Sequence, residues 1–249
     1  MKSVLAAFVF FTRLPLWRWV DVSGENFSRI IPYWPLVGWV TGGISAAALF
    51  YASHLFPATV AVVIALSVRL LLTGALHEDG LADFFDGFGG GSDRQRILSI
   101  MKDSHIGTYG VIALIFYFLF AVSLLTSLPL VLRCLLLLVA DPLAKGVTGM
   151  IVNLLPYARE QSKSGVVYAR MSGPKLTLSL LFALLPVLLF FPVRYWPGIA
   201  VPVILFLALV IFLKRKIGGY TGDCCGAVML LCELSFYITI LFIYSGGWR

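Results

Sequence analysis

The sequence predicts an all-α, polytopic membrane bundle of about seven transmembrane helices. Hydrophobic residues make up 60% of the 249 residues and charged residues only 12%, whereas soluble domains have about 45–50% and about 25%. Long apolar stretches recur along the chain, each with the roughly 20 residues that a helix needs to cross a bilayer. Four cysteines are too sparse for a secreted disulfide scaffold. The aliphatic and aromatic content excludes a disordered chain.

The predicted spans follow one another with short connections, several of which contain proline. Proline is favoured in the first turn of a helix, where its missing N–H leaves no partner unsatisfied. The predicted ranges are roughly 32–53, 57–76, 107–126, 129–152, 175–192, 197–213 and 226–246.

Residues 1–31 are predicted to form an interfacial N-terminal segment. The apolar stretch from Val4 to Phe11 is too short to span a bilayer, and no small-residue cleavage site follows it. Trp17, Trp19 and Trp34 would suit the headgroup region. No linker divides the chain, so residues 1–249 are expected to form one integral-membrane domain.

The distribution of Lys and Arg predicts the orientation. Fourteen of them precede the first span or lie in alternate connections, and the opposite side has only Arg194 and Arg249. The positive-inside rule therefore predicts a cytoplasmic N-terminus and an external C-terminus. The net charge of +7 is explained by this topology and does not indicate a nucleic-acid partner.

Acidic residues cluster in one predicted cytoplasmic segment, 77–106. Asp79, Asp83 and Asp86 have the spacing i, i+4, i+7, which puts three carboxylates on one face of a helix. Like charges repel there, and a divalent cation removes the repulsion. Oxygen ligands indicate Mg²⁺, which commonly also holds substrate phosphates, and no His/Cys set has zinc spacing. The alternative is an ordinary acidic loop at a membrane surface. The six acids of the cluster are Glu78, Asp79, Asp83, Asp86, Asp93 and Asp103.

A glycine-rich stretch, 87–92, follows the acids and is expected to turn sharply and approach a ligand closely. It precedes Arg94, Arg96 and Lys102, residue types that bind phosphate oxygens. Together these features predict a site for a metal–phosphate ligand.

Other polar residues lie within or beside the predicted spans. Asp141, Asp223 and Glu233 are near membrane depth, where a carboxylate usually has a function. For Asp141 the alternative is an i, i+4 ion pair with Lys145 that holds helices together. His77 and His105 flank the acidic segment and titrate near neutral pH when unperturbed; a bystander role is favoured for His77.

Four sequence motifs follow one another along the chain. The most specific is DGLADFFDGFGGG at 79–91 followed by IMKDSHIGTYG at 100–110. The others are FTRLP at 11–15, WPLVG at 34–38 and GGYTGDCCGA at 218–227. In sequence and in order, these motifs resemble those of the cobalamin synthase family, the adenosylcobinamide-GDP ribazoletransferases.

This resemblance covers essentially the whole chain. It implies a bacterial inner-membrane enzyme with its active site facing the cytoplasm. Such an enzyme joins adenosylcobinamide-GDP to α-ribazole, or to its 5′-phosphate, with Mg²⁺. The products are adenosylcobalamin, or its phosphate, and GMP.

The residues and the resemblance together predict roles within the site. Asp79, Asp83 and Asp86 are expected to bind the metal, completed by Asp103 or Asp223, with Glu78 as an extra ligand. Asp86 or His105 would take the hydroxyl proton of the acceptor. Lys102 is predicted as a catalytic cation. The predicted substrate and phosphate contacts are Arg13, Arg94, Arg96, Ser104 and Thr108.

Three rival functions remain open at this point. DGLAD echoes the motif of CDP-alcohol phosphotransferases, although Asp83 stands where that family has Arg. An ion-coupled transporter is a second rival, since acids in broken helices are typical of such proteins. The third, a non-catalytic scaffold, leaves the three carboxylates unexplained. Close glycine pairs are compatible with a substrate cleft or with a homo-oligomer interface.

Overall fold

The protein is a bundle of helices. The computed structural model describes residues 2–18, 24–159 and 166–247, and within these ranges the one β-type contact is an isolated bridge between Tyr157 and Tyr220. The longer helices are α1 (Lys2–Phe11), α3 (Trp34–Ala52), α4 (Ala58–Thr73), α5 (Leu76–Gly90), α6 (Arg94–Lys102), α7 (Thr108–Thr126), α8 (Leu130–Gly149), α10 (Gly173–Phe190), α11 (Ala200–Ile217) and α12 (Gly222–Tyr244). The short ones are η1 (Pro15–Arg18), α2 (Gly24–Phe27), η2 (Ile31–Tyr33), α9 (Ile151–Leu154) and η3 (Val193–Ile199).

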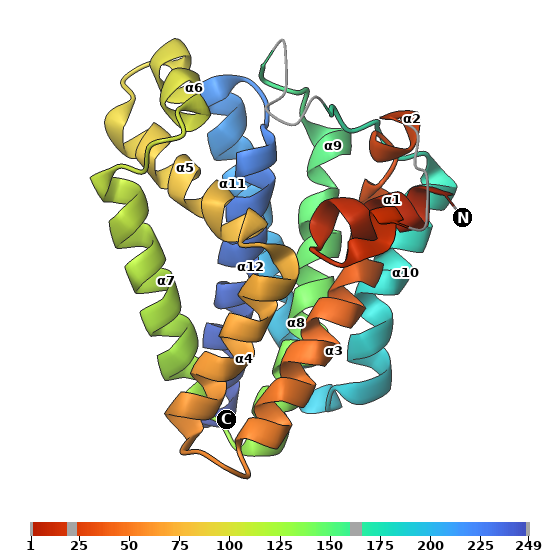
Figure 1. Cartoon of the computed structure of the whole chain (residues 1–249), viewed down its shortest axis with the longest axis vertical. Helices are drawn as coiled ribbons and strands as arrows, with labels where there is room; N and C mark the ends of the chain where they lie inside the picture. Colours follow the sequence, from red (N-terminus) through yellow and green to blue (C-terminus); the bar gives the residue numbers. More distant parts are fainter. Residues whose placement is uncertain (1, 19–23, 160–165, 248–249) are drawn as a thin grey trace.

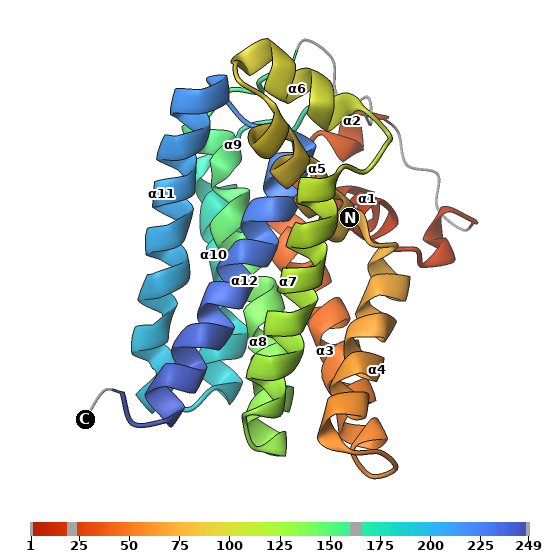
Figure 2. The same ribbon diagram turned by 90° about the vertical axis from the view of Figure 1, so that its left-hand side faces the viewer.

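Seven long helices run side by side along the long axis of the molecule (Figures 1 and 2). They are α3, α4, α7, α8, α10, α11 and α12, and each coincides with one predicted span. Helices α6 and α9 and the connection from α11 to α12 lie together at the upper end of Figure 1, and α1 lies across the bundle. The predicted polytopic helical bundle is therefore confirmed.

The lengths and compositions of these helices fit a multi-pass membrane protein. In the described ranges, five helical segments are long and apolar enough to cross a bilayer, and the bent pair α4–α5 would make a sixth. Helix α8 is equally long but carries Arg133, Asp141 and Lys145, all buried inside the bundle. Large apolar side chains such as Phe116 and Leu189 face outward, which is favourable where lipid covers them.

A sharp bend separates α4 from α5. Gly74 and Ala75 both have left-handed backbone conformations, with φ of 65° and 56°, and the two helix axes differ by 91°. The predicted span 57–76 therefore ends at Thr73, and the acidic residues begin a new helix that is inclined to the bundle (Figure 1). A left-handed glycine is the common way to end a helix.

The prediction of a glycine loop at 87–92 is wrong. Helix α5 continues through Gly90, so most of these glycines are helical despite their low helix propensity. The reason is packing against α6: a Cβ at Gly87 would lie 2.5 Å from the Cγ atom of Met101. The glycines let α6 fold back onto α5.

The aromatic N-terminal region is less peripheral than predicted. Trp34 is buried, with 1% of its surface exposed, and it stacks on Phe11 with ring centroids 5.0 Å apart and an interplanar angle of 15°. The headgroup position expected for Trp34 is therefore wrong, whereas Trp17 is 54% exposed. Trp19 lies outside the described residues.

Glycines predicted to allow close helix contacts are used within the chain. A Cβ at Gly42 would lie 2.6 Å from the carbonyl oxygen of Leu137 on α8, and one at Gly146 would lie 2.3 Å from Cβ of Ala183 on α10. These two glycines therefore bring α3, α8 and α10 together.

Candidate active site

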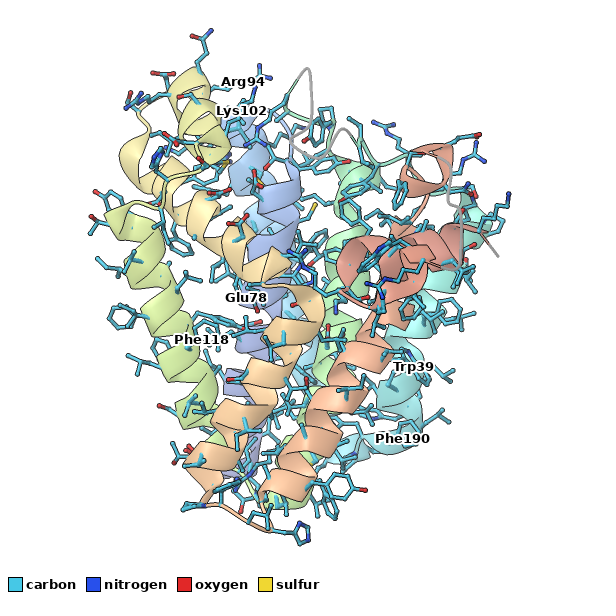
Figure 3. The ribbon with its side chains drawn as sticks, viewed as in Figure 1. Trp39, Glu78, Arg94, Lys102, Phe118 and Phe190 are labelled. Carbon is cyan, nitrogen blue, oxygen red and sulfur yellow. The ribbon has the colours of Figure 1, made fainter. Side chains whose placement is uncertain are left out.

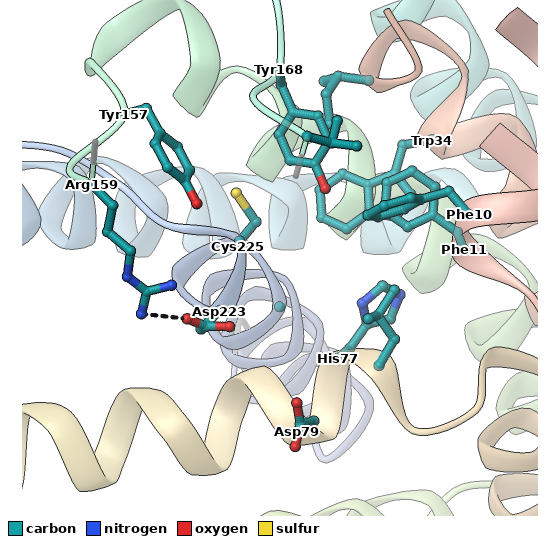
Figure 4. A pocket seen from close by; sticks show the side chains of 15 residues that line it. Phe10, Phe11, Trp34, His77, Asp79, Tyr157, Arg159, Tyr168, Asp223 and Cys225 are labelled. Atoms are coloured by element: carbon teal, nitrogen blue, oxygen red, sulfur yellow. Dashed lines mark hydrogen bonds and ion pairs between the residues drawn. The ribbon is translucent and has the colours of Figure 1, made fainter. Parts of the chain in front are cut away.

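A cavity of about 300 Å³ lies where α5 and α12 meet, and residues of α1 line it from one side (Figure 4). One wall is aromatic and the facing wall is polar. The aromatic wall comprises Phe10, Phe11, Trp34, Tyr157 and Tyr168. The polar wall comprises His77, Asp79, Arg159 and Asp223. We call this the aromatic–acidic cavity; its residues come from segments far apart in the sequence.

Two glycines bring the two acidic motifs together. A Cβ at Gly80 would lie 2.9 Å from the carbonyl oxygen of Asp223, and one at Gly226 would lie 3.0 Å from that of His77. The backbones of α5 and α12 therefore touch at a point that no larger residue would permit. This crossing brings Asp79 and Asp223 to the same cavity.

The predicted metal ligands separate into different surroundings. Asp79 and Asp223 line the aromatic–acidic cavity, and Asp83 lies one turn beyond Asp79 on α5, where it is buried. Glu78 is also buried, with Oε1 4.0 Å from Nη2 of Arg69. Figure 3 shows Glu78 near the start of α5, well below Arg94 and Lys102.

Asp86 binds the beginning of α7. Its carboxylate accepts hydrogen bonds from the backbone N–H groups of Gly107 and Gly110, at 2.7 and 2.8 Å. Carboxylates are stabilised at helix N-termini by the unpaired N–H groups and the helix dipole. The structure therefore gives Asp86 a positioning contact between α5 and α7, and Asp86 does not line the cavity.

Asp103 and His105 form a separate, exposed pair. Nδ1 of His105 lies 2.7 Å from Oδ1 of Asp103, and the hydrogen bonds from the His105 side chain and backbone lower the pKa of Asp103. Neither residue lines the cavity. Ser104 and Thr108 are exposed beside them, so this predicted group does not join Asp79 and Asp223.

A second hollow, which we call the basic groove, adjoins the cavity at Arg159. The groove is about 920 Å³ and includes Arg94, Lys102 and Ser99. Arg159 lines both the groove and the cavity. Nη2 of Arg94 donates to the carbonyl oxygen of Ala158 at 3.0 Å, which joins α6 to the segment that carries Arg159. The predicted phosphate contacts Arg94 and Lys102 are thus brought together (Figure 3).

Two other predicted contacts lie elsewhere. Arg96 is exposed, and its backbone N–H donates to the helix-capping side chain of Asp93. Arg13 lines a different hollow beside the α4–α5 bend, together with Trp17 and Gly74. Its backbone N–H donates to the carbonyl oxygen of Leu72 at 2.7 Å, so Arg13 supports the bend.

Arg159 and the aromatic wall are not among the residues that the sequence predicts for the site. In the sequence, Arg159 is one of several positive charges in a connection, and its neighbours form no motif. Phe11 and Trp34 open two of the recognised motifs, so their positions held a usable signal. His77, for which a bystander role was favoured, lines the cavity 5.6 Å from the ring of Trp34.

The donor set fits a metal that needs few protein ligands. Among the described residues, no three His, Cys, Asp or Glu side chains converge closely enough to hold a metal by themselves. Mg²⁺ commonly uses one or two carboxylates, with substrate phosphates and water completing its shell. Asp79 and Asp223 are two carboxylates that line the cavity, which adjoins the basic groove at Arg159.

Comparisons with known proteins show the family of the chain. A family model described as cobalamin-5-phosphate synthase matches residues 3–241. The chain belongs to that family. A relative from Shewanella amazonensis is 38% identical over 253 residues, covering 98% of this chain and 96% of the relative. One from Shewanella putrefaciens is 37% identical over 246 residues, covering 97% and 94%.

Both relatives are named adenosylcobinamide-GDP ribazoletransferase. The cobalamin synthase resemblance drawn from the four motifs is thereby confirmed, and the chain is a transferase of cobalamin biosynthesis. No solved structure matches the chain.

Proposed function

We propose that this chain transfers the adenosylcobinamide-phosphate group from adenosylcobinamide-GDP to α-ribazole or its 5′-phosphate. The products are adenosylcobalamin or its 5′-phosphate, and GMP. The observation that carries this proposal is the junction of an aromatic–acidic cavity with a basic groove. The names and coverage of the relatives support the same reaction.

The two hollows suit the two reactants. A flat heteroaromatic base gains stacking and apolar burial against Phe11 and Trp34. Trp34 Nε1 and His77 Nε2 are buried without a hydrogen-bond partner among the described residues, and polar groups on the edge of a base would satisfy such atoms. The anionic phosphates suit the groove that contains Arg94 and Lys102.

The reaction is a substitution at phosphorus. The acceptor's hydroxyl oxygen bonds to the phosphorus that carries cobinamide, and the bond from that phosphorus to the bridging oxygen breaks. GMP leaves with the bridging oxygen and its electron pair. The hydroxyl proton passes to a carboxylate oxygen that lines the cavity, of Asp79 or Asp223. Positioning and electrostatic stabilisation dominate the catalysis of such transfers.

The proposed cofactor is Mg²⁺, with Asp79 and Asp223 as its protein ligands. Asp83, on the next turn of α5, is a further candidate ligand. Bound there, the ion would neutralise the charge that develops on the phosphates. The chain's own residues hold the phosphates in the groove and the base in the cavity.

The proposed orientation puts this end of the bundle in the bacterial cytoplasm. Arg94 and Lys102 lie at the upper end of Figure 3, and α11, whose last turn carries three Lys and Arg residues, ends at the same end of the bundle (Figure 1). The positive-inside rule assigns that end to the cytoplasm. The active site then opens to the compartment that contains guanine nucleotides, in the inner membrane.

The test is a turnover assay on protein purified in lipid nanodiscs. Adenosylcobinamide-GDP and α-ribazole are supplied with and without Mg²⁺, and GMP and the new cobamide are measured. The proposal predicts equal amounts of both products, only with Mg²⁺. Formation of CMP from CDP-diacylglycerol and a small alcohol, with no GMP, would overturn it in favour of phospholipid synthesis.

A further inference from the structure

Arg159 occupies the boundary between the two hollows. It lines the aromatic–acidic cavity and the basic groove, whereas the other residues of the groove come from α6, from its capping residue Asp93 and from Ala158. A side chain at this boundary can contact a ligand in either hollow. Nothing in the sequence motifs marks Arg159, because it lies in the connection between α9 and α10.

The fold fixes Arg159 through its backbone as well as its side chain. The N–H of Ala158 donates to the carbonyl oxygen of Tyr220 at 2.8 Å, and the N–H of Tyr220 donates to that of Pro156 at 3.0 Å. A Cβ at Gly219 would lie 2.4 Å from the Pro156 oxygen, so this approach requires glycine. The segment that carries Arg159 is thereby attached to the beginning of α12.

The guanidinium of Arg159 is buried and incompletely paired. Its Nη2 donates to Oδ2 of Asp223 at 2.9 Å (Figure 4), and only 7% of the side chain is exposed. Its Nε–H is buried and has no hydrogen-bond partner among the described residues. A buried charged donor without a partner is costly, so the site is built for an acceptor that arrives with a ligand.

A pyrophosphate is the acceptor that fits best. It is an anion with several oxygens, and arginine matches phosphate oxygens with parallel N–H donors. One carboxylate, Asp223, already balances part of the charge of Arg159, and Arg94 and Lys102 supply further positive charge in the groove. A pyrophosphate bound to Arg159 would lie between the basic groove, which suits the nucleotide phosphates, and the aromatic–acidic cavity, which suits the acceptor base.

We infer that Arg159 binds the pyrophosphate of the nucleotide donor and holds the reacting phosphorus at the entrance of the aromatic–acidic cavity. This inference rests on the proposed function for the identity of the donor. Arg159 is a substrate-binding residue in this account, and its ion pair with Asp223 sets the direction of the guanidinium.

The test compares Arg159→Gln, Arg159→Lys and the wild-type chain in nanodiscs. GDP with Mg²⁺ serves as a probe for the pyrophosphate, and its dissociation constant is measured by calorimetry without turnover. α-Ribazole is titrated separately as a probe for the cavity. Arg29→Gln is the matched control, because Arg29 is exposed and pairs only with exposed Glu25 among the described residues.

Arg159→Gln is expected to weaken GDP binding about 10- to 100-fold, the loss typical of a hydrogen-bonded charged contact. The α-ribazole affinity should change less than about twofold, and Arg159→Lys should recover part of the GDP affinity because it restores the charge without the planar fork. The Michaelis constant for the donor should rise while that for α-ribazole stays constant. Arg29→Gln should match the wild type in every measurement.

Unchanged GDP affinity in a folded Arg159→Gln variant would overturn the inference. An equal loss of GDP and α-ribazole binding, with a lower melting temperature, would assign Arg159 a structural role instead. If Arg159→Gln does not fold, the GDP affinity of Arg159→Lys is used instead. Wild-type affinity in Arg159→Lys would then overturn the inference that the planar guanidinium of Arg159 binds the pyrophosphate. If GDP binding depends on Arg159 but the wild type releases no GMP, the proposed reaction fails and the phosphate site stands.

Discussion

The interior of the bundle and its upper end both contain buried charges, but the two regions use them differently. In the interior, Arg69 on α4 donates to Glu233 on α12 at 2.5 Å and to the hydroxyl of Tyr117 at 2.7 Å. The Tyr237 hydroxyl also donates to Glu233, at 2.9 Å. At the upper end, Arg159 and Asp223 pair while facing two hollows.

In a second interior network, too, the chain itself supplies the partners of the buried charges. Lys145 pairs with Asp141, and Thr41 on α3 donates to Asp141 and accepts a hydrogen bond from Lys145 at 2.9 Å. The ion-pair alternative for Asp141 is therefore confirmed. An acidic residue at membrane depth is thus a weak sign of a site when the chain itself supplies the partners; an opening to a cavity is the better sign.

The largest effect is expected from breaking one half of an interior pair. Arg69→Ala should cost about 3–5 kcal/mol of stability, because it leaves Glu233 buried and unpaired. The control is the double variant Arg69→Met with Glu233→Leu, which should lie closer to the wild type because Glu233 is no longer left as a buried, unpaired charge. Unfolding in mixed micelles measures both. A double variant less stable than the single would contradict the comparison.

The corresponding change at the cavity should affect turnover and leave stability alone. Asp79 is exposed to the cavity, so Asp79→Asn should change the unfolding free energy by less than ~0.5 kcal/mol. Its rate of GMP release should fall about 10²- to 10³-fold, as when one electrostatic contact to a transition state is lost. Glu25→Gln, an exposed change, should leave the rate as it is. A folded Asp79→Asn variant with wild-type turnover would remove Asp79 from the site.

The aromatic wall should affect one substrate only. Phe10 packs edge-on against Tyr168 with ring centroids 6.1 Å apart, and both line the cavity. Phe10→Ala should raise the Michaelis constant for α-ribazole about 5- to 10-fold, since a base stacked on an aromatic ring gains ~1–3 kcal/mol. In steady-state kinetics, the Michaelis constant for the nucleotide donor should stay unchanged. A rise in the donor's Michaelis constant, with that for α-ribazole unchanged, would show that the donor and not α-ribazole binds in the aromatic–acidic cavity.

The smallest effect is expected at the start of α6. Asp93 accepts a hydrogen bond from the backbone N–H of Arg96 at 3.0 Å, which lowers the pKa of Asp93. Because the pKa is lowered on folding, this stabilisation is present above the ordinary carboxyl pKa of ~3.9 and is lost as the pH falls through the lowered value. Asp93→Ala should speed amide exchange in α6 at neutral pH. Equal protection in both proteins at pH 7 would exclude the cap.

Much of the fold could be predicted from the sequence, because long apolar stretches and prolines determine where the helices run. The position of α5 could not, since the bend at Gly74 and Ala75 depends on backbone conformations that residue identity alone does not impose. The helical conformation of the glycines at 87–90 could not be predicted either, because tertiary packing against α6 overrides their low helix propensity.

The candidate site was predictable only in part. The motifs contain Asp79, Asp223 and Lys102, and the basic residues after the glycine-rich stretch include Arg94; the structure groups these four around two adjoining hollows. Spacing along one helix also suggested Asp86, whose oxygens instead bind the N–H groups that begin α7. Arg159 depends on a backbone bridge between residues far apart in the chain, and no local pattern reveals such a contact.

The most direct test of this account is a crystal structure of the chain with Mg²⁺, GDP and α-ribazole bound. The account predicts the phosphates of GDP against Arg159 and Arg94, with the base of α-ribazole beside Phe11 and Trp34. Either ligand seated against Glu233 or Asp141, with the aromatic–acidic cavity empty, would contradict it.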